Sequence, residues 1–391
     1  MTKHVIQFFD TTLRDGEQTI GVNFTVDDKI EIAKRIADWG ADVIEAGFPV
    51  ASPADLAAVR RIGQEVTNAN IVGLARCVKK DIDAVTEALG DAPNGQIHVF
   101  IATSPIHRDS KLHMTKDQVL DRINECVSYA KQAFENVEFS PEDATRTEWD
   151  FLARSVQVAI EAGATVINIP DTTGYTTPVG MANLFKYLQQ NVADFDKVTF
   201  SAHCHNDLGM ATANALAAIE NGATRIEGTI NGIGERAGNT ALEQIVAIMN
   251  ARQDHYSDYT SNVDMTKTYD LAQFISEKSG MGLPNNQPLT GSNVFAHESG
   301  IHQDGFLKNP STYEILTPES VGRTRSTLPL GKLSGSHAVV NRLEQIGFRV
   351  KKEEVPVIFR HFQAIADQSR LVSNEQLRQM MNDISEMKVA N

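Results

Sequence analysis

Eight short runs rich in β-branched and aromatic residues recur through roughly the first 250 residues, and a segment of helical character follows each run. Strands that alternate with helices indicate a parallel sheet, and eight such units of this total length favour a (β/α)8 TIM barrel. A doubly wound open sheet is the alternative, but Leu13–Gln18 after the first run lacks its glycine fingerprint. The expected strands are Val5–Thr12, Val43–Phe48, Ile71–Cys77, Ile97–Thr103, Val137–Ser140, Val166–Pro170, Val198–His203 and Ile226–Asn231.

Beyond about residue 252 the alternation ends, so we expect residues 1–252 to form the catalytic barrel and residues 253–330 to form a linker arm, subdomain I. Residues 331–391 are expected to form a small α-helical C-terminal subdomain II, with helices over 335–349 and 353–385.

Composition excludes several classes of protein. The net charge of −14 argues against nucleic acid and anionic membrane surfaces as partners. No apolar stretch is long enough for a membrane span, and no signal peptide is visible. The three cysteines form no Cys-x-x-Cys pattern, so we expect a reduced, cytoplasmic protein.

Two histidines at i and i+2 follow the apolar run Val198–Phe200. On a strand His203 and His205 point to one face, which is typical of a divalent metal site, although two ordinary hydrogen-bonded histidines are an alternative. Asp15 follows the first expected strand and would complete a two-histidine, one-carboxylate set in a closed barrel. Such a set suits Mg²⁺, Mn²⁺, Zn²⁺ or Fe²⁺ and can chelate a 2-oxo acid.

Other polar residues at strand ends extend this candidate site. Arg14 can bind a substrate carboxylate, and Glu45 can hold Arg14 in place, although a structural ion pair explains Glu45 about as well. Asn239 is a further metal ligand or a helix N-cap. Glu142 is a candidate acid or base rather than an ordinary loop carboxylate, and Thr172 binds substrate or caps a helix.

Two glycine-containing segments need separate interpretation. The loop after the eighth expected strand lies where barrels often bind phosphate, although its Gly-x-Gly-x-x-x-Gly spacing is a weak signal. His297 and His302 are five residues apart, whereas the zinc-protease motif requires two histidines at i and i+4 on a helix, so this motif is excluded. Gly300 also disfavours a helix between them. We expect His302 to be an acid or base that the arm brings to the barrel mouth. In the glycine-rich loop after the eighth expected strand, the candidate cofactor-binding residues are Gly232, Gly234, Glu235, Arg236 and Gly238.

Together these stretches resemble the 2-isopropylmalate synthase family, which belongs to a superfamily of metal-dependent barrel lyases and Claisen-condensing synthases. The resemblance spans nearly the whole chain in the family's order. It lies in Asp10–Gln18, Glu45–Pro49, Ile101–His107, Phe139–Thr147, Asn168–Tyr175, His203–Gly209, Asn231–Asn239 and Gly300–Gly305.

The resemblance implies condensation of acetyl-CoA with 3-methyl-2-oxobutanoate, by a homodimer in which the arm with His302 crosses to the partner subunit. It implies Mn²⁺ or Mg²⁺, with Zn²⁺ as a further option and K⁺ as an activator. The implied ligands are Asp15, His203 and His205, with Asn239 at or beside the ion. Arg14, beside Glu45, would polarise the keto group of the substrate. Glu142 and His302 would transfer protons, with Tyr313 as helper, and Thr172 would bind the substrate carboxylate. The pocket would be shaped by His98, Ser140 and Asn168.

Several alternatives stay open. Citramalate synthase would use pyruvate as the acceptor, and homocitrate synthase would use 2-oxoglutarate, for whose second carboxylate His98 is the one cationic candidate. A carbon–carbon lyase would use the same metal without acetyl-CoA, and a metal-stabilised binding module would have no activity. Many family members continue into a leucine-binding regulatory domain that this chain lacks, so we expect no inhibition by leucine.

Overall fold

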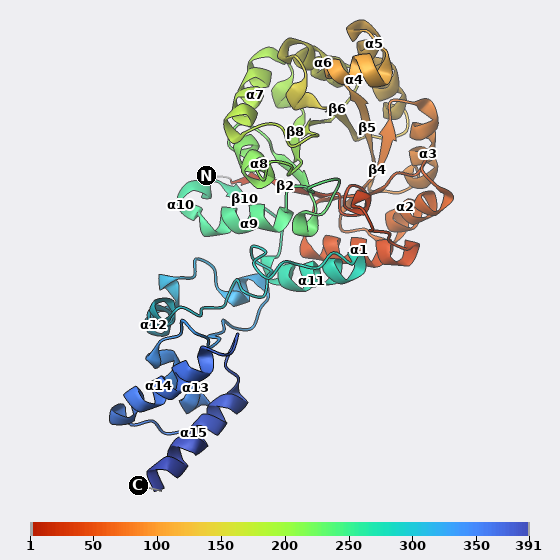
Figure 1. The fold of residues 1–391 in the computed structure, drawn as a ribbon. Coiled ribbons are helices and arrows are strands. Elements are labelled where there is room, and N and C mark those ends of the chain that lie inside the picture. The colour runs from red at the N-terminus through yellow and green to blue at the C-terminus, as the bar shows by residue number, and fades with distance from the viewer. Residues whose placement is uncertain (1–2, 390–391) are drawn as a thin grey trace. The chain divides into compact units, whose positions relative to one another are not determined.

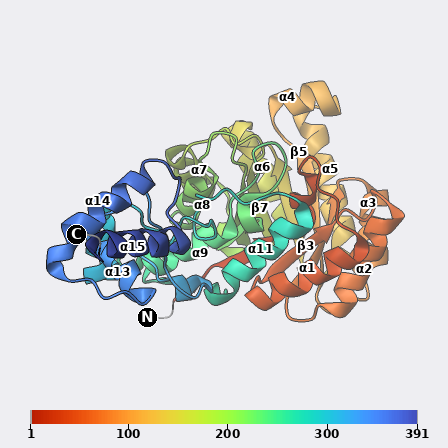
Figure 2. The ribbon, with the colours of Figure 1, turned by 60° about the horizontal axis from the view of Figure 1, so that its bottom comes forward.

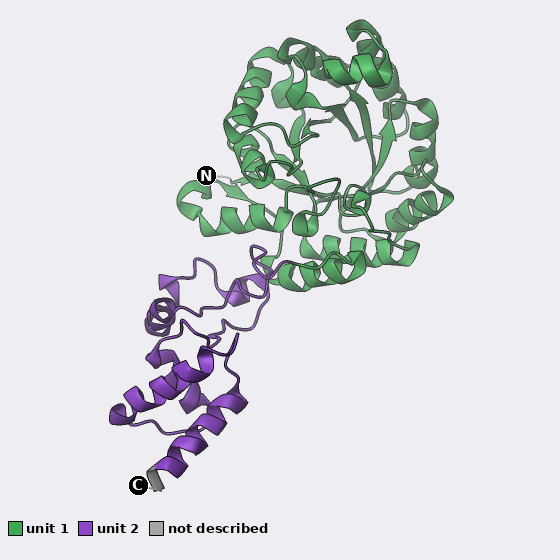
Figure 3. Ribbon diagram, in the orientation of Figure 1, with its two compact units in different colours: residues 1–283 green, residues 284–391 purple. Residues whose placement is uncertain are grey.

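The structure is a computed structural model that describes residues 3–389, and it contains two compact units, residues 1–283 and 284–391 (Figure 3). The units are described separately below. The finer division expected from the sequence, with boundaries after residues 252 and 330, stays a prediction, and residues 390 and 391 of its last part lie outside the described residues.

Eight parallel strands close into a barrel in the first unit, with helices around it, which confirms the (β/α)8 fold (Figure 1). Each strand pairs with its sequence neighbours, and the first barrel strand pairs with the last to close the cylinder. The barrel strands are β2 (Gln7–Asp10), β3 (Val43–Gly47), β4 (Asn70–Arg76), β5 (Gly95–Ala102), β6 (Val137–Glu142), β7 (Val166–Asp171), β8 (Thr199–Cys204) and β9 (Arg225–Gly228).

The helices begin and end where local chemistry favours it. Thr25 caps the first of them in a reciprocal capping box with Asp28, and Gly40 ends it in the left-handed region at φ 104°. The barrel helices are α1 (Val26–Trp39), α2 (Pro53–Glu65), α3 (Lys79–Leu89), α4 (Pro105–His107), α5 (Lys116–Lys131), α6 (Trp149–Glu161), α7 (Pro178–Asn191), α8 (Ala211–Ile219) and α9 (Leu242–Ala251). Figure 2 shows α4 extending from the rim, where a π-helical turn at Arg108–Leu112 follows it.

The first expected strand, Val5–Thr12, is in fact two strands and a turn. Strand β1 (His4–Val5) pairs with β10 (Tyr259–Thr260) outside the barrel. The chain changes partners at Ile6, whose amide donates to the carbonyl of Thr260, whereas the next amide donates to Thr224. Strand β2 then ends at Asp10 because the Asp10 carboxylate accepts from the amide and hydroxyl of Thr12, which turns the backbone.

Helix α11 (Thr268–Ser279) packs on the outside of α1, after the short helix α10 (Gln253–Tyr256). The Trp39 indole donates to Thr268 Oγ1 at 3.0 Å. Lys278 pairs with Asp28 at 2.7 Å, and the Arg35 guanidinium lies 3.8 Å from the ring centre of Phe274. The segment after the last barrel helix is therefore part of the barrel unit.

The second unit contains α12 (Gly300–Lys308), α13 (Ser336–Gln345), α14 (Val355–Ala366) and α15 (Asn374–Val389). The expectation that Gly300 disfavours a helix is wrong, because Gly300 is the first helical residue, and a Cβ there would lie 2.8 Å from the amide nitrogen of Gly335. The expectation of a single helix over residues 353–385 is also wrong, because α14 and α15 are two separate helices. They separate because Val372 donates to the carbonyl of Leu330 and Ser373 starts a new cap.

No helix within residues 3–389 has both the length and the apolar character that a membrane crossing requires.

Phe362 on α14 is fully buried in the core of the second unit, so Phe362→Ala should destabilise the protein by about 3–5 kcal/mol through lost contacts and a cavity. Val357→Ala on the same helix, at a side chain that is 43% exposed, should cost under about 1 kcal/mol. Urea unfolding followed by circular dichroism compares the two. Equal losses for both variants would contradict this account of the core.

Candidate active site

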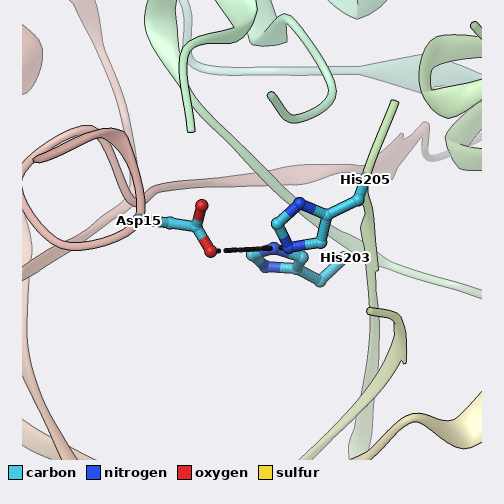
Figure 4. A group of neighbouring side chains, drawn as sticks. All are labelled: Asp15, His203 and His205. Atoms are coloured by element: carbon cyan, nitrogen blue, oxygen red, sulfur yellow. Dashed lines mark ion pairs between the residues drawn. The ribbon is translucent and has the colours of Figure 1, made fainter. Parts of the chain in front are cut away.

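Three potential metal ligands converge at the C-terminal mouth of the barrel (Figure 4). The Asp15 Oδ2 atom lies 3.7 Å from Nε2 of His203 and 3.5 Å from Nε2 of His205. His203 lies on β8, and His205 directly after it forms a backbone bridge with Asn239. The alternation along β8 therefore turns both imidazoles toward the Asp15 carboxylate, as the sequence pattern predicts.

The three side chains have the protonation states that a metal requires. Burial lowers the pKa of His205 to about 4, in spite of the nearby Asp15 charge, and it also lowers the pKa of His203. Burial alone would raise the pKa of Asp15, but the charge of Arg14 and those of the two histidines outweigh it and lower that pKa. At neutral pH the set therefore offers two neutral imidazoles and one carboxylate.

Asn239 supplies a second test of whether this set fits a metal ion. Its Nδ2 donates to Asp15 Oδ1 at 2.8 Å, which orients the carboxylate. Its Oδ1 is buried and has no hydrogen-bond partner among the described residues. A buried oxygen without a partner costs free energy, and a bound cation beside it would remove that cost. The donor set therefore fits a divalent ion.

Arg14 lies beside the three ligands in an ion pair with the fully buried Glu45 and is itself only partly buried. Its Nε donates to Glu45 Oε2 at 2.6 Å, and its Nη1 donates to Asp15 Oδ2 at 2.8 Å. Nη2 donates no hydrogen bond to any described residue, and Arg14 lines the cavity. The pair is thus a structural ion pair that also leaves one edge of the guanidinium free for a ligand.

The mouth of the barrel encloses a cavity of about 250 Å³. The sequence-predicted residues in its wall are Arg14, Asp15, His98, Ser140, Glu142, Asn168, Thr172, His203, His205, Glu235 and Arg236. Glu45 and Asn239 lie behind this wall, fully or almost fully buried.

Sequence reasoning missed the apolar wall of the cavity, which includes Phe48, Leu74, Phe100 and Pro170, and also the polar Gln18. Strand alternation could have found Phe100, which lies two residues after the predicted His98 on β5. The barrel register places Leu74 directly beside His98. Pairing the expected strands in register was the missing step.

A chain of hydrogen bonds inside the barrel joins Arg14 to the pocket residues. The carboxylate of Glu45 accepts from His98 Nδ1 at 2.9 Å. His98 Nε2 then accepts from Ser140 Oγ at 2.6 Å, and Ser140 Oγ accepts from Asn168 Nδ2 at 2.9 Å. Because a carboxylate only accepts, this order fixes the tautomer of His98. The three predicted pocket residues therefore hold one another in place.

Glu142 and Thr172 occupy neighbouring strand ends. Both oxygens of Glu142 accept from Lys111 Nζ, at 2.9 and 3.0 Å, and His107 lies 3.8 Å away. The hydroxyl of Thr172 accepts from the amide of Asp143 at 2.9 Å. Lys111 belongs to the π-helical turn at the rim, which the sequence pattern did not reveal.

The glycine-rich loop packs against the metal ligands. Gly234 has φ 155°, and a Cβ there would lie 2.7 Å from Asp15 Oδ1, so glycine permits the close approach of this loop. Arg236 donates to both oxygens of Asp207, at 2.8 and 2.9 Å, and to the carbonyl of Thr172. The cofactor-binding role of Gly232, Gly234, Glu235, Arg236 and Gly238 stays a prediction.

His302 and Tyr313 belong to the second unit, where their ring centres are 4.2 Å apart. Tyr313 follows a short 3-10 turn, and both side chains are exposed. Nearby, His297 contacts Glu314 at 3.0 Å. The roles expected for His302 and Tyr313 in the chemistry at the barrel mouth stay predictions.

Comparison with known proteins agrees with this geometry. A family model described as HMGL-like matches residues 5–275, and one described as homocitrate synthase post-HMGL domain-like matches residues 289–370. The 2-isopropylmalate synthase of Streptococcus gallolyticus is 54% identical over 376 residues, which cover 96% of this chain and 72% of that protein. The corresponding synthase of Staphylococcus saprophyticus is also 54% identical, with 97% and 74% covered.

Among solved structures, the HMG-CoA lyase from Bacillus subtilis aligns with a TM-score of 0.61 and covers 73% of this chain and 97% of that chain. At 21% identity this likeness concerns the fold alone. Barrel and cavity thus define a barrel enzyme of the HMGL-like class, with a candidate divalent-metal site. Within that class, the chain belongs to the 2-isopropylmalate synthase family.

The buried Glu45 carboxylate should make stability depend on pH. Burial would raise its pKa, but Arg14 and the hydrogen bond from His98 lower it from 4.5 to about 2. A lowered pKa stabilises the fold above pH 4.5, and this contribution is lost as the pH falls toward 2. Between pH 5 and pH 3 the wild type should lose about 2 kcal/mol that Glu45→Gln does not lose.

Chemical unfolding at each pH measures this difference. Glu31→Gln, at a half-exposed carboxylate paired with Arg35, is the control and should follow the wild type. Parallel pH profiles for the wild type and Glu45→Gln would show that Glu45 is not held as a stabilised carboxylate.

Proposed function

We propose that this chain condenses acetyl-CoA with 3-methyl-2-oxobutanoate and water to give 2-isopropylmalate and CoA, the first committed step of leucine biosynthesis. The observation that supports this most is the joint presence, in one cavity, of metal donors, a free guanidinium edge and an apolar wall. We also propose that the protein acts in the cytoplasm.

The 2-oxo acid would bind at the ligand set of Asp15, His203 and His205. A bound Mn²⁺ or Mg²⁺, with Zn²⁺ as a further option and K⁺ as an activator, would act there as a Lewis acid on the keto group. Arg14 would direct its free Nη2 at the same oxygen and stabilise the charge that develops on it. The hydroxyl of Thr172, in the cavity wall, would bind the substrate carboxylate.

The branched side chain of the acceptor would pack against Leu74 and Phe100 in the apolar wall. The same wall argues against 2-oxoglutarate, whose second carboxylate needs a cation. His98, the candidate expected from the sequence, already has both ring nitrogens bonded, to Glu45 and Ser140.

The carbon–carbon bond requires removal of a proton from the acetyl methyl group. A base takes this proton, the resulting enolate carbon attacks the keto carbon, and the new alkoxide gains a proton. Water then cleaves the thioester and releases the CoA thiol. We assign the proton transfers to Glu142 and His302, with Tyr313 as helper, and the acetyl-CoA contacts to the glycine-rich loop at residues 232–238.

The acceptor preference is measured by release of free thiol from acetyl-CoA in the presence of Mn²⁺ or Mg²⁺. The value of kcat/KM should be highest with 3-methyl-2-oxobutanoate, at least tenfold above pyruvate and 2-oxoglutarate, because the apolar wall contributes about 1–3 kcal/mol to a branched side chain. Chelation of the metal should abolish thiol release with every acceptor.

A higher kcat/KM with pyruvate would retain the chemistry but contradict the pocket assignment. Thiol release that survives complete removal of the metal would contradict the role of Asp15, His203 and His205. Absence of thiol release with all three acceptors would contradict the condensation and favour the lyase reaction.

We further propose a homodimer in which His302 is donated across subunits to the barrel site. Arg14→Ala and His302→Ala should each be inactive alone because each lacks a different part of the site. If the two variants are unfolded together and refolded at equal amounts, about half of the dimers contain one copy of each. Each such dimer has one intact site, so about a quarter of wild-type activity should return. Thiol release measures the recovery.

Refolding each variant by itself is the control for this experiment. No recovery in the mixture, with dimers present by light scattering, would show that His302 serves the barrel of its own chain.

A further inference from the structure

One buried acid next to the metal donors has no role in the chemistry described above. Glu227 on β9 is fully buried and lies directly beside His203 in the register of β8 and β9. We infer that Glu227 is a positioning residue that holds His203 in the tautomer and orientation that present Nε2 to the ion. This inference rests on the proposed metal site but on no particular acceptor.

The hydrogen bonds around Glu227 define its action on His203. Oε2 accepts from His203 Nδ1 at 3.1 Å and from Asn168 Nδ2 at 3.2 Å, while Oε1 accepts from Ser201 Oγ at 2.8 Å. Ser201 and Asn168 both donate to Glu227, which makes this side chain an acceptor, so its contact with His203 places the imidazole proton on Nδ1. The lone pair of Nε2, the atom 3.7 Å from Asp15 Oδ2, is therefore directed at the metal site.

His205 shows by contrast why His203 needs such a partner. The backbone of His205 is held by the bridge to Asn239, and its Nδ1 is buried without a hydrogen-bond partner among residues 3–389. His203 is instead oriented through its side chain. Loss of Glu227 should therefore loosen one of the two imidazoles and leave the other in place.

Glu227 also completes the internal chain of hydrogen bonds. Asn168 donates both to Ser140 and to Glu227, so the chain that starts at Arg14 and Glu45 ends at His203. The two sides of the metal site, in the turn after β2 and on β8, are thus linked through the barrel interior. Removal of a carboxylate that orients a ligating histidine typically weakens metal binding about 10–100-fold.

Glu227→Gln tests this inference, because an amide keeps the shape of the side chain but has one acceptor oxygen for three donors. Mn²⁺ alone is titrated into the metal-free full chain, and free Mn²⁺ is measured by electron paramagnetic resonance. Glu243→Gln is the matched control. Glu243 is also fully buried, but it accepts from the Asn231 amide and contacts no metal ligand.

The expected result is a 10–100-fold weaker Kd for Mn²⁺ in Glu227→Gln and a change under about threefold in Glu243→Gln. A Kd for Glu227→Gln within threefold of the wild type would overturn the inference, as would an equal loss in both variants. The outcome is independent of thiol release, so a failure of the proposed condensation would not affect it.

A second measurement needs no substitution at Glu227. Nitrogen chemical shifts of the imidazoles in the metal-free wild type report the tautomer, and the His203 signal is assigned by its absence in His203→Asn. The Nδ1–H tautomer supports the inference. The Nε2–H tautomer overturns it, because Glu227 would then receive no proton from His203.

Discussion

The ion pair between the partly buried Arg14 and the fully buried Glu45 is the interaction on which the barrel mouth depends. A guanidinium and a carboxylate removed from water are costly unless each is fully paired. Glu45 meets this condition with Arg14, Thr11 and His98, and Arg14 also holds Asp15. The position of the first metal ligand is thus set by electrostatics inside the barrel rather than by the loop that bears it.

The interior of this barrel is polar where many barrels are filled by apolar layers. Lower in the barrel, Arg225 donates to Glu138 at 3.0 Å and to Gln7, and its guanidinium lies over the ring of Phe9. Such a core contributes less hydrophobic stabilisation, and it offers instead a rigid set of donors and acceptors. Rigidity at the mouth is what catalysis by preorganised charges requires.

Sequence patterns were sufficient wherever one local rule decides the structure. The two-residue spacing of His203 and His205 implies a shared face, and the two imidazoles do lie together beside Asp15. They were insufficient where distant segments decide. Position 300 at the start of α12 needs a glycine because the backbone at Gly335 lies against it, and Glu227 contacts His203 because β9 lies beside β8. Neither relation is visible in a local window of residues.

The change of partners at Ile6 has a consequence for how the chain is made. Strand β2 pairs with β9 across a separation of more than 200 residues, and β1 pairs with β10 further on. During synthesis the first strand therefore leaves the ribosome long before the strands that cover its edge. A nascent chain of this protein exposes an unpaired strand edge for most of its translation, and closure of the barrel is a late, non-local step.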